Sequence, residues 1–389
     1  MLLFGIDNLV LQNPAWKKQK IAFVTNHAAT NNQLISSRKI LLQNGFNIIK
    51  LFSPEHGLDI QGADGTAINN TIDALTNLPI ISLYNKKLQP SEEDLKDVDI
   101  VLFDIPDIGC RYYTYLWTMT YVLEACANYH TPFIILDRPN PISGNLSLAE
   151  GAMLNETFCS SFIGRWNIPL RHSCTLGELA LYFNSTKNLH ANIEVIHTKH
   201  WQRNMFHNDW HIDFIPTSPA IQHFNAALLY TGLGLLEATN VSEGRGANTP
   251  FEIAGAAYLQ HNKICTVFNT MQDAVVLKPI QFTPTFGKYK NELCNGVKFY
   301  IQDFTSYQAV FTALLFMKVV KDLHTHYFTW SNYPTIVNPT GERHLDKLLG
   351  IPSSEEIFDL PMQLFLKRIE QETHIPEWKK EINSYLLYE

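Results

Sequence analysis

The segment FSPEHG (52–57) places a glutamate and a histidine, Glu55 and His56, directly after an apolar run. That run, NIIKLF (47–52), has the length and the β-branched content of a buried strand. A carboxyl group at the end of such a strand is partly removed from water, which favours its protonated form and suits it to donate a proton near neutral pH. Glu55 is therefore a candidate general acid, and His56 is a candidate to orient it or to bind substrate hydroxyls. The alternative is a carboxylate that only caps a backbone turn, beside a structural histidine.

Short apolar runs of this kind alternate with helical patterns over the first 140 residues. The alternation predicts a Rossmann-like, mostly parallel sheet in an α/β fold, with helices on both faces. SSRKILLQNG, with Gly45 as its terminator, and YTYLWTMTYVLEACANYH are the predicted helices between strands. The predicted strands are KIAFVT (20–25), NIIKLF (47–52), PIISLY (79–84), DIVLFD (99–104) and PFIILD (132–137).

Polar and charged side chains follow four of these strands. In open parallel sheets, ligands bind in the crevice outside the carboxyl ends of the strands, so these side chains are expected to gather in one crevice. No G-x-G-x-x-G follows the first strand and no GxxxxGK[ST] occurs in the chain, so a nucleotide is not expected and we predict no cofactor. The crevice candidates are Asn26, Glu55, His56, Asp104, Asp107, Arg111, Asp137, Arg138 and Asn140.

Beyond residue 150 the sequence changes character, and we predict a first domain over 1–212 and a smaller α+β domain over 213–389 that completes the cleft. In the second domain VKFYIQDF (297–304) reads as a strand and AVFTALLFMKVVKDL (309–323) as a helix. The segment EGRGANTPFE (243–252) contains a capping-box pattern that predicts a helix starting at Pro250. Arg245 would then lie near the positive end of that helix, where an anionic group is favoured. Glu243, flanked by a glycine, is a further catalytic candidate.

Composition excludes several classes of protein. A formal net charge of −7 without any Lys/Arg-rich run argues against nucleic-acid binding. Six scattered cysteines and histidines at 197, 200, 207 and 211 form no convincing disulfide framework or metal motif, so we predict no metal. No apolar run is long enough to cross a membrane, and the first residues lack the features of a signal peptide. These features predict a cytoplasmic protein without a membrane partner, although a mature exported chain would look the same.

Several motifs, taken together, resemble one family. SPEHG (53–57), FDIPDIGCRYYTY (103–115), DRPNPISG (137–144), PLRHSCTLGELA (169–180), SEGRG..TPFE (242–252) and FTPTF.K (282–288) are similar, in that order, to the NamZ-type exo-β-N-acetylmuramidases. The resemblance runs from about residue 4 to the C-terminal region. It implies a Rossmann-like domain, a smaller C-terminal domain, a cleft between them, and removal of N-acetylmuramic acid from the non-reducing end of peptidoglycan fragments. Pro106 and Ala220 depart from the family pattern, as does Ala28-Ala29.

Glycoside hydrolysis needs a proton donor and stabilisation of an oxocarbenium-like transition state. With Glu55 as the acid, Asp104, Asp107 and Glu243 are candidates for a second carboxyl group, and the 2-acetamido oxygen of the sugar is a further possibility. The lactyl carboxylate of muramic acid calls for an arginine, for which Arg245, Arg111 and Arg138 are candidates. Ion pairs of Arg111 with Asp104 or Asp107, and of Asp137 with Arg138, are the structural alternatives.

Two rival functions share the same cleft. One is a non-catalytic protein that binds muropeptides or sugars, and the other is a metal-dependent hydrolase of an ester or amide in the same polymer. Loss of bond cleavage on replacing Glu55 separates the muramidase from the first rival, and sensitivity to a chelator separates it from the second.

Overall fold

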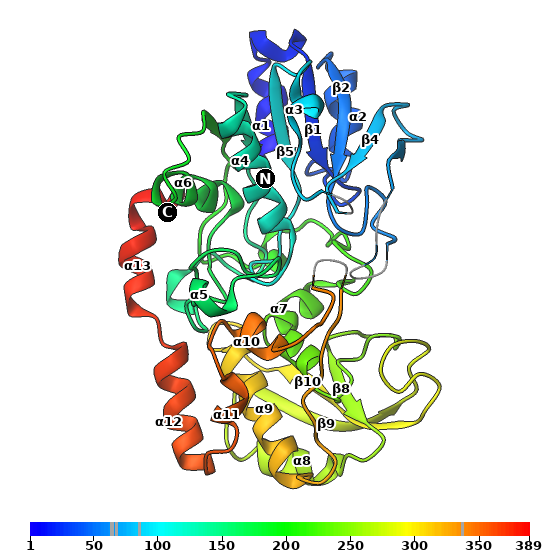
Figure 1. The fold of residues 1–389 in the computed structure, drawn as a ribbon, viewed down its shortest axis with the longest axis vertical. Coiled ribbons are helices and arrows are strands. Elements are labelled where there is room, and N and C mark those ends of the chain that lie inside the picture. Colours follow the sequence, from blue (N-terminus) through cyan, green and yellow to red (C-terminus); the bar gives the residue numbers. More distant parts are fainter. Residues whose placement is uncertain (63–65, 67–68, 85–86, 336–337) are drawn as a thin grey trace.

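The computed structural model describes residues 1–62, 66, 69–84, 87–335 and 338–389, and it places them in an upper and a lower part (Figure 1). The upper part is built on a seven-stranded sheet of order β3-β4-β2-β1-β5-β6-β7 within the described residues. Every pairing is parallel except that of β3 with β4. The strands are β1 (Ile21–Thr25), β2 (Ile48–Ser53), β3 (Thr71–Ile72), β4 (Pro79–Ser82), β5 (Ile100–Asp104), β6 (Phe133–Leu136) and β7 (Ile193–Ile196).

Helices cover both faces of this sheet, as the sequence predicts. Alternate residues of β1 belong to different cores, with Ile21 and Phe23 packed in one and Ala22 and Val24 in the other. Helices α1 and α2 supply the first core, while α4 and α6 supply the second. The helices and single turns of this part are α1 (Gly5–Gln12), η1 (Ala15–Lys18), α2 (Ser37–Gln43), α3 (Glu92–Leu95), α4 (Tyr115–Asn128), η2 (Leu146–Leu148), α5 (Glu156–Cys159), α6 (Leu176–Thr186) and η3 (His207–Trp210).

The lower part contains a three-stranded antiparallel sheet of order β8-β10-β9, against which α8 packs, while α9 packs on both α7 and α8 (Figure 1). Buried side chains of both parts belong to one continuous core, so the two parts share a packed interface. Its elements are α7 (Phe224–Leu233), η4 (Gly234–Ala238), β8 (Ile253–Ala256), α8 (His261–Phe268), β9 (Val275–Phe282), β10 (Cys294–Ile301), α9 (Ala309–Leu323), α10 (His344–Leu349), α11 (Ser354–Ile357), α12 (Met362–Thr373), α13 (Pro376–Ile382) and η5 (Asn383–Tyr385).

The end of the chain returns to the upper part. Helices α12 and α13 run up one side of the molecule, and the C-terminus lies beside α6 (Figure 1). The indole of Trp378 donates a hydrogen bond of 2.9 Å to the backbone carbonyl of His172, and the hydroxyl of Tyr388 donates one of 2.6 Å to Asp137. The predicted boundary near residue 212 stays a prediction, but the last residues pack on the first domain. None of the described helices is both long and apolar enough to span a membrane.

The predicted helix at Pro250 is wrong. Residues 249–252 form turns, Phe251 has a left-handed backbone with φ of +61°, and the chain enters β8 at Ile253. The Phe251 amide donates to the carbonyl of Glu243, and the Glu252 carbonyl accepts from the amide of Phe299 on β10, so the local capping pattern yields to pairing with the sheet. Arg245 is therefore not at the end of a helix. Gly244 and Gly246 do turn the chain with positive φ, as expected from the motif.

Candidate active site

A pocket of about 790 Å³, open to solvent, lies between the two parts of the molecule. Glu55 and His56 reach it from the end of β2, and Tyr112–Thr114 reach it from the start of α4. The lower part contributes Glu237 from η4 and residues of the 218–251 segment and of α10. The full lining is Glu55, His56, Tyr84, Tyr112, Tyr113, Thr114, Ser161, Phe162, Ile163, Ser218, Ala220, Ile221, Tyr230, Glu237, Arg245, Phe251, Tyr333, Thr335, Asn338, His344, Lys347 and Leu348.

Glu55 is held in place at the pocket wall. Its side chain is buried, and Oε2 accepts a hydrogen bond of 2.6 Å from the Thr114 hydroxyl. His56 next to it has a left-handed backbone, with φ of +66°, and its Nδ1 lies 2.8 Å from the carbonyl oxygen of Gly62. Because a carbonyl can only accept, Nδ1 carries the proton in this contact, which fixes the tautomer of the ring. The turn after β2 thus orients the two side chains that the SPEHG motif singles out.

Aromatic rings line much of the pocket. Tyr112 and Tyr113 lie edge to face with Tyr230, at ring centroid distances of 5.1 and 5.9 Å. The hydroxyl of Tyr112 donates to the backbone carbonyl of Tyr230, and the hydroxyl of Tyr113 donates to the Thr217 hydroxyl, at 2.6 and 2.7 Å. These contacts connect the start of α4 to the lower part of the molecule. Aromatic walls with a few polar groups are typical of pockets that hold a sugar or another small molecule.

A network of charges lies on the other side of the cleft. Glu237 accepts from the Arg245 guanidinium at 2.6 Å, and its second oxygen lies 3.6 Å from Nε2 of His344. Burial alone would raise the pKa of Glu237, but Arg245 and His344 outweigh it and lower that pKa to about 2. Glu237 is therefore an ionised carboxylate throughout the ordinary pH range.

Glu243, predicted as a catalytic candidate, belongs to the same network but is not part of the pocket lining among the described residues. Its carboxylate lies 3.3 Å from Nε of Arg245 and accepts from Nζ of Lys288 at 3.0 Å. Lys288 also donates to the backbone carbonyls of Leu236 and Val241. Glu243 thus supports the arginine that in turn pairs with Glu237.

Of the residues predicted at the strand ends, the pocket brings together Glu55 and His56, and the EGRG motif adds Arg245. Asp104 and Arg138 instead pair with each other, and Arg138 also donates to the carbonyl of Thr30 at 2.6 Å. Arg111 is fully buried and donates to three backbone carbonyls, those of Ala152, Ile168 and Leu348. Neither arginine lines the main pocket in the described part of the chain.

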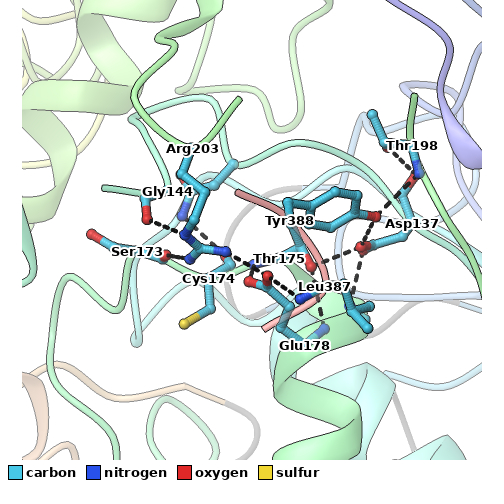
Figure 2. Close-up of polar contacts among 12 residues, drawn as sticks. Asp137, Gly144, Ser173, Cys174, Thr175, Glu178, Thr198, Arg203, Leu387 and Tyr388 are labelled. Atoms are coloured by element: carbon cyan, nitrogen blue, oxygen red, sulfur yellow. Dashed lines mark hydrogen bonds and ion pairs between the residues drawn. The ribbon is translucent and has the colours of Figure 1, made fainter. Parts of the chain in front are cut away.

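Asp137 is part of a buried network that joins the C-terminus to the sheet (Figure 2). Its carboxylate accepts hydrogen bonds from the Thr175 hydroxyl, the Gly177 amide and the Tyr388 hydroxyl, at 2.7, 2.9 and 2.6 Å. Burial raises the pKa of Asp137 to about 6, although these donors oppose the shift. Figure 2 also shows Arg203 paired with Glu178 in the same region.

Asn26 and Asn140 are likewise buried, and each organises a turn. The Asn26 side chain accepts from the amide of Ala28 at 3.1 Å, and the Asn140 side chain accepts from the amide of Ile142 at 3.0 Å. The Asn140 amide group also donates to the carbonyl of Cys174. Both side chains therefore shape the loops that follow their strands.

Asp107 and Arg138 line a second pocket of about 490 Å³ at the ends of β1, β5 and β6. The sheet order reverses between β1 and β5, so this smaller pocket occupies the switch point at which the sequence rule expects a ligand. Asp107 accepts from the amide of Gly109 at 2.7 Å and lies 3.5 Å from Nε2 of His172. The strand-end residues therefore divide between two pockets and a buried framework.

Comparison with known proteins agrees with this geometry. The family model described as "Exo-beta-N-acetylmuramidase NamZ, N-terminal" matches residues 21–225, and the corresponding C-terminal model matches residues 228–388. The chain belongs to the NamZ family. The resemblance inferred from the motifs is confirmed, and the α/β architecture predicted from the strand pattern is confirmed with it.

One curated relative and two solved structures are similar to this NamZ family member. The peptidoglycan β-N-acetylmuramidase NamZ of Bacillus subtilis (strain 168) is 40% identical over 330 residues, which cover 83% of this chain and 78% of that protein. Crystal structures of two DUF1343 family proteins from Bacteroides fragilis NCTC 9343 cover 100% of this chain and 99% of their own chains. Their TM-scores are 0.88 and 0.75, at identities of 29% and 27%.

Sequence reasoning missed the pocket residues of the NamZ C-terminal part, above all Glu237, His344 and Lys347. Glu237 stands alone in the apolar run LLYTGLGLLEA (228–238), and a single acid in such a run was the one available signal. The histidines at 197, 200, 207 and 211 form no metal site, and no group of three or more potential ligands occurs among the described residues.

Proposed function

We propose that this chain is an exo-acting β-N-acetylmuramidase, which hydrolyses the bond of a non-reducing-end N-acetylmuramic acid in peptidoglycan fragments. The observation that supports this function best is a single pocket lined by a buried, oriented Glu55 from the first domain and an ionised Glu237 from the second. Glycoside hydrolases pair an acid that protonates the leaving oxygen with a second carboxylate that stays ionised. The family model and the Bacillus relative support the same reaction.

In the proposed mechanism Glu55 is the general acid. It transfers its proton to the glycosidic oxygen as that oxygen leaves the anomeric carbon, while the Thr114 hydroxyl holds Oε2 in place. Water then supplies a hydroxyl group to the anomeric carbon, and its remaining proton restores the carboxyl group. His56, whose tautomer is fixed by the Gly62 carbonyl, binds sugar hydroxyls or keeps Glu55 in position.

Glu237 is the second carboxylate in this mechanism, in place of Asp104, Asp107 and Glu243. Its pKa of about 2 keeps it negatively charged, so it can stabilise the positive charge that develops at the anomeric centre. Arg245 and His344 hold the carboxylate group at the pocket wall. Aromatic rings around it provide the apolar faces on which a pyranose packs.

The test is hydrolysis of a chromogenic β-N-acetylmuramic acid glycoside beside its β-N-acetylglucosamine counterpart, for the wild type and Glu55→Gln, with and without EDTA. We expect release from the muramic acid substrate alone, loss of activity in the variant, and indifference to the chelator. Circular dichroism of the variant controls for folding. Binding without cleavage by the wild type would make the pocket a receptor, and inhibition by EDTA would make the protein a metal-dependent hydrolase.

We further propose that the substrates are small imported fragments acted on in the cytoplasm, as expected for cell-wall recycling. Fractionation of the native cells, with activity measured in the cytoplasmic and exported fractions, tests this location. Activity confined to the exported fraction would contradict it.

A further inference from the structure

Muramic acid carries a lactyl group whose carboxylate distinguishes it from N-acetylglucosamine. A pocket that already contains the ionised carboxylate of Glu237 disfavours a further negative charge unless a cation compensates it. A cation that serves this purpose must line the pocket and must not be engaged by the protein's own acids. Among the described residues, the lysine and arginine side chains that line the pocket are those of Arg245 and Lys347.

Arg245, the arginine favoured by the sequence, is already engaged. Its guanidinium lies 2.6 Å from Glu237 and 3.3 Å from Glu243, and it packs over the ring of Phe251 at 4.8 Å from the ring centroid. Turning this group toward a substrate carboxylate would break its ion pairs with two buried acids, leaving Glu237 with only His344 and Glu243 with only Lys288, which is costly. Arg245 is therefore suited to hold Glu237 rather than to bind the substrate anion.

Lys347 lies on α10, and its ammonium group makes no hydrogen bond or ion pair with the described residues. Its side chain is partly buried, and it stands three residues after His344, so both project from the same face of the helix toward the pocket. Glu342 and Asp346 attract its charge, but neither forms an ion pair with it. Lys347 is thus a cation at the pocket wall with unused hydrogen-bonding capacity.

The helix that carries Lys347 is firmly held. Arg111 of the first domain donates to the backbone carbonyl of Leu348 at 2.9 Å. Asp346 accepts from the amides of Ser353 and Ser354, at 3.1 and 2.8 Å, which fixes the turn that follows α10. A lysine on a rigid element offers a defined ammonium position, with a flexible stem that adapts to the substrate.

We propose that Lys347 binds the lactyl carboxylate of muramic acid and so determines the preference of this pocket for N-acetylmuramic acid over N-acetylglucosamine. The inference rests on the proposed function, because it names the group that selects the substrate of the same site. Burial lowers the pKa of Lys347, in agreement with a cation whose charge the protein itself leaves only partly compensated.

The experiment compares Lys347→Met with the wild type on two chromogenic glycosides: N-acetylmuramic acid and its uncharged lactyl amide. Loss of one charge-assisted hydrogen bond is expected to lower kcat/KM for the acid by about 10- to 100-fold. Activity on the amide should change less than about 3-fold, so the preference for the acid largely disappears. Lys347→Arg, which keeps the charge, should retain most of that preference, and Lys367→Met, at an exposed position of α12, should retain all of it.

The outcomes separate this inference from the proposed function. If the wild type prefers the acid over the amide and Lys347→Met shows the same preference, the role of Lys347 is overturned while the proposed function stands. If neither substrate is cleaved, calorimetric binding of free N-acetylmuramic acid and N-acetylglucosamine still decides the matter: the inference requires that Lys347→Met removes the preference for the acid. Lys347→Gln replaces the Met variant if that variant fails to fold.

Discussion

Replacing Glu237 by Gln tests both the charge network and the proposed mechanism. The Gln side chain has the shape of the acid but resembles its protonated form, so it removes the interaction with Arg245 and His344. The pKa of Glu237 falls from 4.5 to about 2 in the folded protein. At 1.36 kcal/mol per pKa unit, this difference corresponds to about 3 kcal/mol of stability at neutral pH.

The sign of the pH dependence follows from the lowered pKa. A carboxylate that is stabilised in the folded state contributes its full stability above the unfolded-state pKa and loses it as the pH falls toward the folded-state pKa. Glu237→Gln should therefore destabilise the protein by about 3 kcal/mol at pH 7 but only by about 1 kcal/mol at pH 3. Urea denaturation of both proteins at these two pH values measures the difference.

The same variant tests catalysis. If Glu237 is the second carboxylate, kcat at pH 7 should fall by about 10²- to 10⁴-fold in protein that is still folded. Glu252→Gln is the matched control, since Glu252 is also buried and lies 3.5 Å from Lys298, yet is absent from the pocket lining in the described residues. An unchanged kcat in Glu237→Gln would refute the catalytic role, and equal destabilisation at both pH values would refute the electrostatic reasoning.

Three further substitutions test other parts of the structure. Thr114→Val removes the donor to Glu55, so kcat/KM should fall about 10-fold while Thr114→Ser restores it; equal activity in both variants would contradict the orienting role. Arg111→Met removes three hydrogen bonds to buried carbonyls, of which only that of Ile168 keeps another donor among the described residues, the amide of Leu154, and the urea midpoint should fall by the equivalent of about 3 kcal/mol. Asp137 has a raised pKa, so its protonated form is favoured by folding and wild-type stability should decline as the pH rises from about 4 to about 6. Tyr388→Phe removes a donor to the ionised form, so it should cost about 1–2 kcal/mol at pH 7.5 and less at pH 4, measured by urea denaturation; an equal loss at both values would contradict this.

The strands were predictable because buried parallel strands are almost continuously apolar. All five strands predicted for the first domain are present, and α9 has the limits that its sequence suggests. Within this sheet β3 and β7 were missed, and they are its edges; β8 and β9 of the second domain were missed as well. β3 has two exposed residues and β7 carries an exposed Glu194 in its middle, so neither has the composition of a buried strand.

The site was only partly predictable for a different reason. The rule that ligands bind at strand ends led to Glu55, but it cannot tell which charges at that edge satisfy one another. Asp104 pairs with Arg138, and Asp137 accepts three hydrogen bonds from distant parts of the chain. Glu237 lies far from Glu55 in the sequence and belongs to no motif, so only the tertiary structure shows that they share a pocket.

The buried charges outside the pocket have a consequence for the reaction. Glycoside hydrolysis depends on the separation of two carboxyl groups, and here those groups come from different domains. Arg111 of the first domain holds α10 of the second, and Glu150 of the first domain accepts from the amide of Val310, at the start of α9, at 3.2 Å. Both hydrogen bonds cross the interface between the two domains. Each joins a side chain of the first domain to a backbone group of the second, and a backbone group cannot move by changing rotamer. Polar residues that seemed to be ligand-binding candidates, such as Arg111, thus keep the two halves of the pocket at a fixed distance.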